Sequence, residues 1–186
     1  MILLDGITVY HGSYIAVPNP NLSKCESGKD FGQGFYVTTD IEQAKRFVKS
    51  SVGKAKKNKI EVANENQGFV SKYTYKSDES LKIYVFENAD REWLHCVAGH
   101  RKSGLLDDVI KKWKNYDIIA GKIANDNTNQ VITAYINGLY GKVGSEEADR
   151  IAISLLLPER LTDQICFRTD KAIKTLSYFE NETVTI

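Results

Sequence analysis

The chain has 186 residues, of which 25 are Lys or Arg and 24 are Asp or Glu, so its formal net charge is +1. Hydrophobic residues make up 42% and charged residues 26%, which is ordinary for a globular protein and excludes collagen-like, wholly disordered and membrane-spanning classes. Balanced charge also excludes a general attraction to nucleic acid or anionic lipid, and the length favours a single domain over residues 1–186.

The three cysteines are widely spaced along the chain. Cys25, Cys96 and Cys166 form no C-x-x-C pair, so we expect no metal site, and an odd number without a framework is typical of a reducing compartment. The first residues show neither the basic nor the long apolar segment of a secretory signal. We therefore expect a cytoplasmic protein with no membrane partner.

The first 38 residues predict two strands joined by a loop. Alternating β-forming residues at 7–10 predict a strand that ends at His11. Residues 17–30 are rich in Pro, Asn, Ser and Gly and predict a loop with room for a short helix. Residues 32–38 predict a second strand, entered through glycines.

A helix is predicted to begin at Ile41. Asp40 is a suitable N-cap, and Gln43 stands at the position that completes a capping box. Its apolar side, at i, i+3 and i+4, is Ala44, Phe47 and Val48. Residues 49–68 are polar, with a basic stretch at 54–59, and indicate either a solvated helix end and mobile loop or a patch for a polyanionic partner.

The remaining chain predicts further strands and helices without a strict βαβ rhythm. The predicted strands are 70–75 and 81–86, with a turn at 77–79 between them, and then 116–121 and 164–167. The predicted helices are 92–98, 129–139, 145–157 (stopped by Pro158) and a short one within 170–176. This mixture favours an α+β fold with substantial antiparallel pairing over a doubly wound parallel sheet.

Three separated segments carry residues suited to chemistry. They are Tyr-His-Gly-Ser at 10–13, Asp-Phe-Gly-Gln-Gly-Phe-Tyr-Val-Thr-Thr-Asp at 30–40, and Asp-Gln-Ile-Cys-Phe at 163–167. A second aromatic residue, Phe47, follows Tyr36 by eleven positions.

Together these segments resemble the ADP-ribosyltransferase superfamily, on the diphtheria-toxin and poly-ADP-ribose polymerase side that carries a His, Tyr, Glu triad. The Asp-Phe-Gly-x-Gly-Phe-Tyr form is similar to an uncharacterised bacterial branch. The resemblance rests mainly on residues 7–48 and implies a split, mostly antiparallel β core with flanking helices and an NAD cleft.

The resemblance also assigns roles to individual residues. His11 would bond a ribose hydroxyl of NAD, and the backbone of Gly12 would bond the nicotinamide carboxamide, which a glycine lets approach closely. Tyr36 and Phe47 would hold the nicotinamide ring between them, where stacking and cation–π attraction contribute on the order of 1–2 kcal/mol. The rest of the implied NAD-binding set is Ser13, Gly34 and Phe35.

The third element departs from the family pattern. The resemblance implies a catalytic Glu at the start of a late strand, and the matching position holds Gln164. An amide can bond a ribose hydroxyl but stabilises a developing cation less, and losing one aimed electrostatic group costs on the order of 10²–10³ in rate. The candidates to supply the missing charge are Glu146, Glu147, Glu159 and Asp163.

The implied function is cleavage of nicotinamide from NAD and transfer of ADP-ribose to a macromolecular acceptor, protein or nucleic acid, in the manner of an intracellular toxin or effector. His11, Tyr36 and Gln164 would be its catalytic residues, with NAD as substrate and no metal. The alternatives are a catalytically weak NAD or ADP-ribose binding module and an NAD glycohydrolase. The sequence predicts neither the acceptor nor the oligomeric state.

Each of these residues also has a purely structural interpretation. His11 fits an ordinary strand-end histidine, Tyr36 and Phe47 fit core aromatics, and Gly32 and Gly34 fit turn glycines. Their joint order and spacing favour the NAD site.

Other polar residues have weaker claims to a function. Trp93 with Arg101 is interpreted as a helix-surface pair. Asp117 and Asp126 are interpreted as loop caps, although Asp126 could reach a cleft from a strand-end loop. Cys25 and Cys166 lack a His at a spacing typical of a cysteine nucleophile.

Overall fold

The computed structural model describes residues 3–62, 64–123, 126–156 and 161–186, and they form two β-sheets. One sheet has the order β1-β3-β7, with β1 at Thr8–Ser13, β3 at Gln67–Tyr75 and β7 at Leu176–Thr185. The other has the order β2-β6-β5-β4, with β2 at Phe35–Val37, β6 at Asp163–Phe167, β5 at Ile118–Lys122 and β4 at Ile83–Val85. The pair β4–β5 is parallel and the other named pairs are antiparallel.

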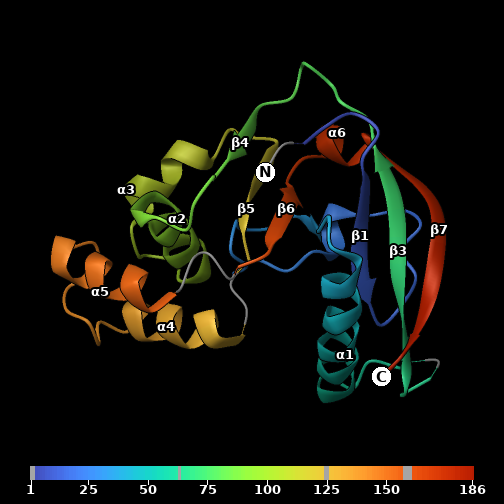
Figure 1. The fold of residues 1–186 in the computed structure, drawn as a ribbon, viewed down its shortest axis with the longest axis horizontal. Helices are drawn as coiled ribbons and strands as arrows, with labels where there is room; N and C mark the ends of the chain where they lie inside the picture. The colour runs from blue at the N-terminus through green and yellow to red at the C-terminus, as the bar shows by residue number, and fades with distance from the viewer. Residues whose placement is uncertain (1–2, 63, 124–125, 157–160) are drawn as a thin grey trace.

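The helices divide between the two sheets (Figure 1). The first, α1 (Ile41–Lys57), packs on β1 and β3. A second group lies at the left of the figure, on the other side of the four-stranded sheet: α2 (Arg91–Arg101), α3 (Asp107–Ile110), η2 (Lys111–Trp113), α4 (Asp126–Ile136) and α5 (Glu146–Leu156). Two short helices, η1 (Leu22–Lys24) and α6 (Asp170–Ile173), lie in connections. The prediction of an α+β fold with a mostly antiparallel core is confirmed.

Side chains alternate between the two faces along each strand of the four-stranded sheet, and both faces are covered. Phe35, Ile165 and Phe167 point into a core shared with Val9 and Tyr73 of the other sheet. Tyr36, Ile119 and Cys166 point the opposite way, into a second core built with the helices α2, α4 and α5. The residues of β2 and β6 therefore stand between two hydrophobic layers.

The N-cap of α1 is confirmed, whereas the capping box is only half formed. Asp40 Oδ1 accepts from the backbone N–H groups of Glu42 and Gln43 at 2.9 and 3.2 Å. The Gln43 side chain instead donates to the Asp163 carbonyl at 3.4 Å, and the Asp40 N–H donates to Thr38 Oγ1 at 3.1 Å. The start of α1 is thereby tied to β2 and β6.

The first strand is longer than the sequence predicts. It runs through His11 and Gly12 to Ser13, because these residues pair with β3, His11 opposite Ser71 and Gly12 opposite Val70. The glycine does not break the strand. A Cβ at Gly12 would overlap the Ala44 carbonyl oxygen, so the missing side chain is what allows α1 to approach β1.

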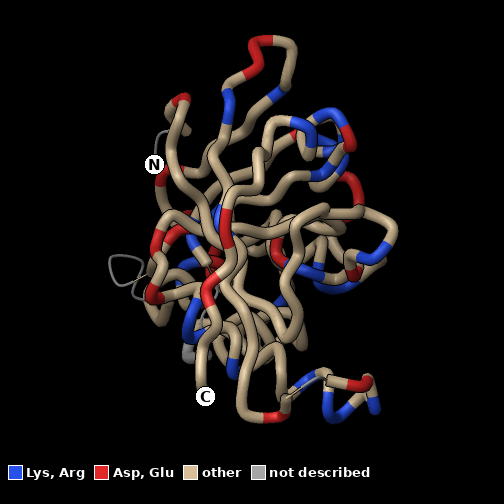
Figure 2. Tube along the Cα trace, turned by 90° about the vertical axis from the view of Figure 1, so that its right-hand side faces the viewer, with Lys and Arg blue, Asp and Glu red and all other residues tan. Residues whose placement is uncertain are grey.

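The C-terminal strand β7 was not predicted, because charged residues interrupt its apolar pattern. Lys72 of β3 pairs with Glu180 and Glu182 of β7 at 2.9 and 3.2 Å, and Lys45 of α1 pairs with Glu182 at 2.9 Å. Figure 2 shows acidic and basic segments interspersed on this side of the molecule. These charges suit an edge strand, which must avoid pairing with other chains.

The other predicted elements are confirmed with small shifts of their ends. The predicted strands 70–75 and 81–86 both form, but β3 and β4 belong to different sheets. Pro158 and the last residue of the predicted helix 145–157 lie outside the described residues. Across the described residues, no helix has both the length and the apolar character needed to cross a membrane.

Candidate functional site

Three neighbouring strands carry the three predicted catalytic residues. An isolated antiparallel bridge between Tyr10 and Thr38 joins β1 to β2, and β2 pairs with β6 with Tyr36 opposite Cys166. His11 and Tyr36 thus lie beside the bridge, and Gln164 lies one strand further along in β6. The two sheets part at this bridge, so β1 and β2 are joined at one end only.

His11 is anchored on β2 by its ring. Because a carbonyl only accepts, Nδ1–H donates to the Tyr36 carbonyl oxygen, 2.7 Å away. The ring centroid lies 4.4 Å from that of Phe35. Burial lowers the pKa of His11, although the bond to Tyr36 opposes this, so the imidazole is neutral near pH 7. With Nδ1 protonated, Nε2 is an acceptor suited to a hydroxyl donor.

The N–H and C=O of Gly12 point to the side of β1 on which the bridge to Thr38 lies. Tyr10 exchanges both of its backbone hydrogen bonds with Thr38, the residue that follows β2, at 2.8 and 3.0 Å. Because backbone groups alternate in direction along an antiparallel strand, the N–H and C=O of Gly12 point the same way as those of Tyr10, away from β3. Among the described residues no other group bonds to them. A buried amide that presents an unpaired donor and acceptor is unusual.

Tyr36 is fixed by its hydroxyl, which donates to the Gly32 carbonyl at 2.7 Å and accepts from the Phe31 N–H at 2.9 Å. Burial raises the pKa of Tyr36 well above its ordinary value, so the phenol stays neutral. The side chain is only partly buried. The hydroxyl therefore holds the loop before β2, and part of the ring remains accessible.

Gln164 is bonded to a carboxylate that the sequence did not single out. Its Nε2 donates to Asp30 Oδ2 at 2.6 Å and to the Lys122 carbonyl at 3.3 Å. Asp30 Oδ1 accepts a hydrogen bond from Arg101 Nε–H at 2.7 Å and forms an ion pair with Nη2 at 2.6 Å, and Arg101 Nη1 donates to Asn129 Oδ1 at 2.6 Å. Asp30 begins the motif before β2, and that membership was the one sequence signal available.

A hollow of about 490 Å³ opens beside this pair. Asp30 lines it together with Lys54 of α1 and Arg101 of α2. The Lys54 ammonium lies 5.6 Å from the ring centroid of Phe47, which is not itself a lining residue. The rest of the lining comes from Gly28, Lys29, Lys102, Asn129, Thr133, Ile136 and Asn137. Arg101 is paired with Asp30 and Lys29 with Glu26, but the four cationic side chains and one carboxylate of the lining still carry a net positive charge, which suits an anion.

The spacing of the apolar residues predicts Phe47 on the buried side of α1. The structure does not place it there. Ala44 and Val48 are buried against the sheet, whereas Phe47 is 44% exposed. A helix turns 100° per residue, so position 47 falls at the edge of the apolar stripe. Among the ring contacts of the described residues, none joins Phe47 to Tyr36.

Trp93 and Arg101 do not form the predicted helix-surface pair. Trp93 is fully buried and donates from Nε1 to the Lys122 carbonyl at 3.0 Å, while Arg101 bonds Asp30. The surface interpretation fails because α2 packs against β5 as well as against its neighbouring helices.

Asp117 is confirmed as a cap, since it accepts from the Lys82 N–H and the Thr169 hydroxyl, each at 2.8 Å. Asp126 begins α4, and its side chain lies outside the described residues. The role of Asp126 as a residue that reaches the cleft therefore stays a prediction.

The residues proposed to replace the missing Glu lie elsewhere or are engaged. Asp163 Oδ1 pairs with the Lys122 ammonium at 3.0 Å. Glu146 and Glu147 are exposed in the first turn of α5, and Glu159 lies outside the described residues. The carboxylate that reaches position 164 is instead Asp30.

The thiols offer no nucleophile. Burial raises the pKa of Cys166 to about 12 and also raises the pKa of Cys25. A thiolate is therefore scarce at neutral pH. Within the described ranges, no group of three or more His, Cys, Asp or Glu side chains is arranged to hold a metal ion.

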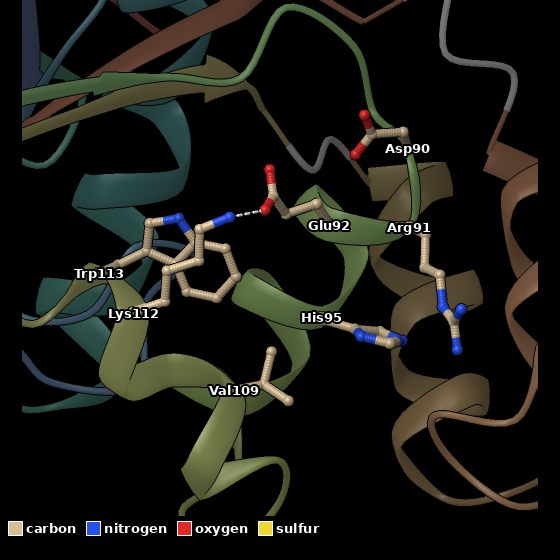
Figure 3. A pocket seen from close by; sticks show the side chains of 7 residues that line it. All are labelled: Asp90, Arg91, Glu92, His95, Val109, Lys112 and Trp113. Atoms are coloured by element: carbon tan, nitrogen blue, oxygen red, sulfur yellow. Dashed lines mark hydrogen bonds and ion pairs between the residues drawn. The ribbon is translucent and has the colours of Figure 1, made fainter.

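A second hollow, of about 400 Å³, lies at the start of α2 and contains none of the predicted site residues (Figure 3). Lys112 reaches across it to Glu92. Arg91 and His95 lie side by side and bond the buried Asp149 of α5 at 2.6 and 2.9 Å. These charged side chains are thus paired with one another or with Asp149. They join helices and do not indicate a ligand site.

The fold and site define an α+β domain whose split sheet gathers His11, Gly12, Tyr36 and Gln164 from three neighbouring strands. The chain belongs to the family described as Protein of unknown function (DUF3990), whose model matches residues 7–178. Comparison with curated proteins found no match, and comparison with solved structures found none either.

Proposed function

We propose that this protein is an ADP-ribosyltransferase that cleaves nicotinamide from NAD and transfers ADP-ribose to a macromolecular acceptor. In that reaction the bond between ribose C1′ and the nicotinamide nitrogen breaks, and its electron pair leaves with neutral nicotinamide. The ribose is left with oxocarbenium character. A nucleophile of the acceptor then bonds C1′ and gives up its proton.

One observation carries the proposal: among the described residues the N–H and C=O of Gly12 have no partner, and they point to the β2 side of β1, next to His11. A primary carboxamide has one donor face and one acceptor face, which is what the Gly12 C=O and N–H would complement. The neutral His11 imidazole, with Nε2 as an acceptor, lies on the same strand and suits a ribose hydroxyl. Tyr36 and Gln164 stand on the next two strands.

The basic hollow supports the same placement for the rest of the dinucleotide. It adjoins Gln164 through Asp30, and its Lys and Arg side chains would balance the charge of a diphosphate. The hollow lies within the size range of small-ligand sites. In this arrangement Phe47, next to Lys54 on α1, would contact the part of the ligand near this hollow, whereas the resemblance assigns it to the nicotinamide ring.

The amide at position 164 favours a second candidate, a module that binds NAD or ADP-ribose with little turnover. Gln164 lacks the charge that stabilises a ribosyl cation. Hydrolysis of NAD, with water as the acceptor, is the third outcome that chemistry allows.

A single assay separates these functions. The protein is incubated with NAD carrying ³²P in the ADP-ribose part, in the presence of candidate protein and nucleic-acid acceptors, while released nicotinamide is measured. Transfer predicts nicotinamide together with label on a macromolecule. Nicotinamide without label indicates hydrolysis, and saturable binding without nicotinamide indicates the module.

His11→Ala is expected to weaken NAD binding, measured calorimetrically, because it removes the hydroxyl acceptor. His100→Ala is the matched control, since His100 is also a partly buried histidine of lowered pKa and lies outside the proposed site. Equal NAD affinity in the two variants would contradict the proposed site.

A further inference from the structure

The Gln164 amide can take only one orientation in this structure. Its nitrogen faces two acceptors, the Asp30 carboxylate at 2.6 Å and the Lys122 carbonyl at 3.3 Å. Rotating the amide by 180° would set its oxygen against both acceptors and lose both bonds. The carbonyl oxygen, Oε1, therefore points away from Asp30, and no described residue donates to it.

Asp30 is held as firmly as the amide it orients. It is 7% exposed, and its other carboxylate oxygen accepts a hydrogen bond from Arg101 Nε–H and forms an ion pair with Arg101 Nη2. Bonds to an ionised acceptor are shorter and roughly twice as strong as neutral ones. Such a bond also polarises the amide and makes its oxygen a better acceptor for a hydroxyl.

Asp30 also combines charge with access. It lines the basic hollow, and among the described carboxylates it is the one bonded to Gln164. Its negative charge therefore lies one hydrogen bond from the group that is aimed at the ribose in the proposed function.

We infer that Asp30 and Gln164 form one functional unit in which the two tasks of a single glutamate are divided. Gln164 Oε1 accepts the ribose hydroxyl, and Asp30 is the positioning residue that fixes the amide and supplies the negative charge. This inference rests on the proposed function. It explains how an amide at position 164 is compatible with NAD cleavage.

The pair can be exchanged by mutation. Gln164→Glu alone places two carboxylates in contact with no hydrogen-bond donor between them, so their like charges repel. Asp30→Asn alone keeps the shape and removes the charge. The double variant, which combines Asp30→Asn with Gln164→Glu, restores an amide–carboxylate bond with the charge moved to position 164, while the amide oxygen at position 30 still accepts from Arg101.

The test measures nicotinamide release and thermal unfolding for the wild type, both single variants and the double variant. We expect Asp30→Asn to lower kcat by roughly 10²-fold with the KM for NAD little changed. We expect the double variant to recover most of this activity and to unfold at a higher temperature than Gln164→Glu. Wild-type kcat in Asp30→Asn, or losses that simply multiply in the double variant, would overturn the inference.

The control is Asp149→Asn, which removes the other buried aspartate that is bonded to an arginine. It is expected to lower the unfolding temperature and leave kcat unchanged. The two levels of the proposal fail differently. A wild type that does not cleave NAD, whether or not it binds NAD, refutes the proposed function and the inference with it, whereas wild-type cleavage with an unaffected Asp30→Asn variant refutes the inference alone.

Discussion

Gly12 shows how one residue serves both packing and the proposed site. Its missing side chain lets the Ala44 carbonyl lie against β1, and its N–H and C=O point to the β2 side of β1. The sequence indicated a close backbone approach at this position but attributed it to a ligand. The structure shows that the helix α1 makes one such approach.

Gly12→Ala is therefore expected to lower the free energy of unfolding by about 1–3 kcal/mol, as overpacking does. Gly53, inside α1, is the matched control, because a Cβ there meets nothing within 4 Å. Gly53→Ala is expected to stabilise the protein by roughly 0.5–1 kcal/mol, the usual gain in a helix. Chemical denaturation measures both, and equal effects would contradict the assigned packing role.

His11 links burial to pH dependence. Burial lowers its pKa in the folded protein below the value of about 6.5 expected in the unfolded chain. Between these two values the unfolded chain binds more protons, so stability rises with pH and falls as the solution is acidified below about 6.5. His100 contributes in the same sense.

Urea unfolding between pH 5 and 8 is expected to show this slope, and His11→Asn is expected to make it shallower. Asparagine retains a donor for the Tyr36 carbonyl but does not titrate in this range. A slope identical to that of the wild type would show that His11 has the same pKa in both states.

At the scale of elements, Asp149 holds three helices together. It lies on α5 and bonds Arg91 and His95 of α2 and the hydroxyl of Tyr135 on α4. Burial alone would raise the pKa of Asp149, but these donors outweigh it and lower the pKa below its ordinary value. Its contribution to stability is therefore present above about pH 4 and is lost as the pH falls through the folded pKa.

Asp149→Asn is expected to destabilise the protein by about 1–3 kcal/mol, because the buried partners Tyr135 and His95 keep only a weaker acceptor. The loss measured at pH 7 should shrink in acid, where the wild-type carboxylate is itself protonated. Thermal unfolding at the two pH values measures it. A loss independent of pH would show that packing, and not the charge, stabilises the helices.

Local sequence patterns predicted most of the helices and strands. The features that they did not predict depend on pairing between residues far apart in the sequence. The N-cap at Asp40 and the buried strand at β6 follow from residues close in sequence. β7 was missed because its charged residues pair with Lys45 and Lys72 only in the folded sheet. The contact between Asp30 and Gln164 spans 134 positions and has no local signal.

At the scale of the whole molecule, the fold turns a balanced composition into an uneven surface. The net charge is +1, yet Lys29, Lys54, Arg101 and Lys102 gather around one hollow. β1 and β2 belong to different sheets, and among the described residues the N–H and C=O of Gly12 on β1 have no partner. Tyr36 lies on the neighbouring strand β2. The proposed function requires one NAD molecule to reach both the basic hollow and the Gly12 backbone groups.

The most direct test is a crystal structure of the protein with NAD or nicotinamide bound. We expect the nicotinamide carboxamide within hydrogen-bond distance of the Gly12 N–H and C=O, with its ring against Tyr36 and, for NAD, the diphosphate in the basic hollow. A dinucleotide bound elsewhere, or no ligand beside Gly12 and Tyr36 at saturating NAD, would contradict the account.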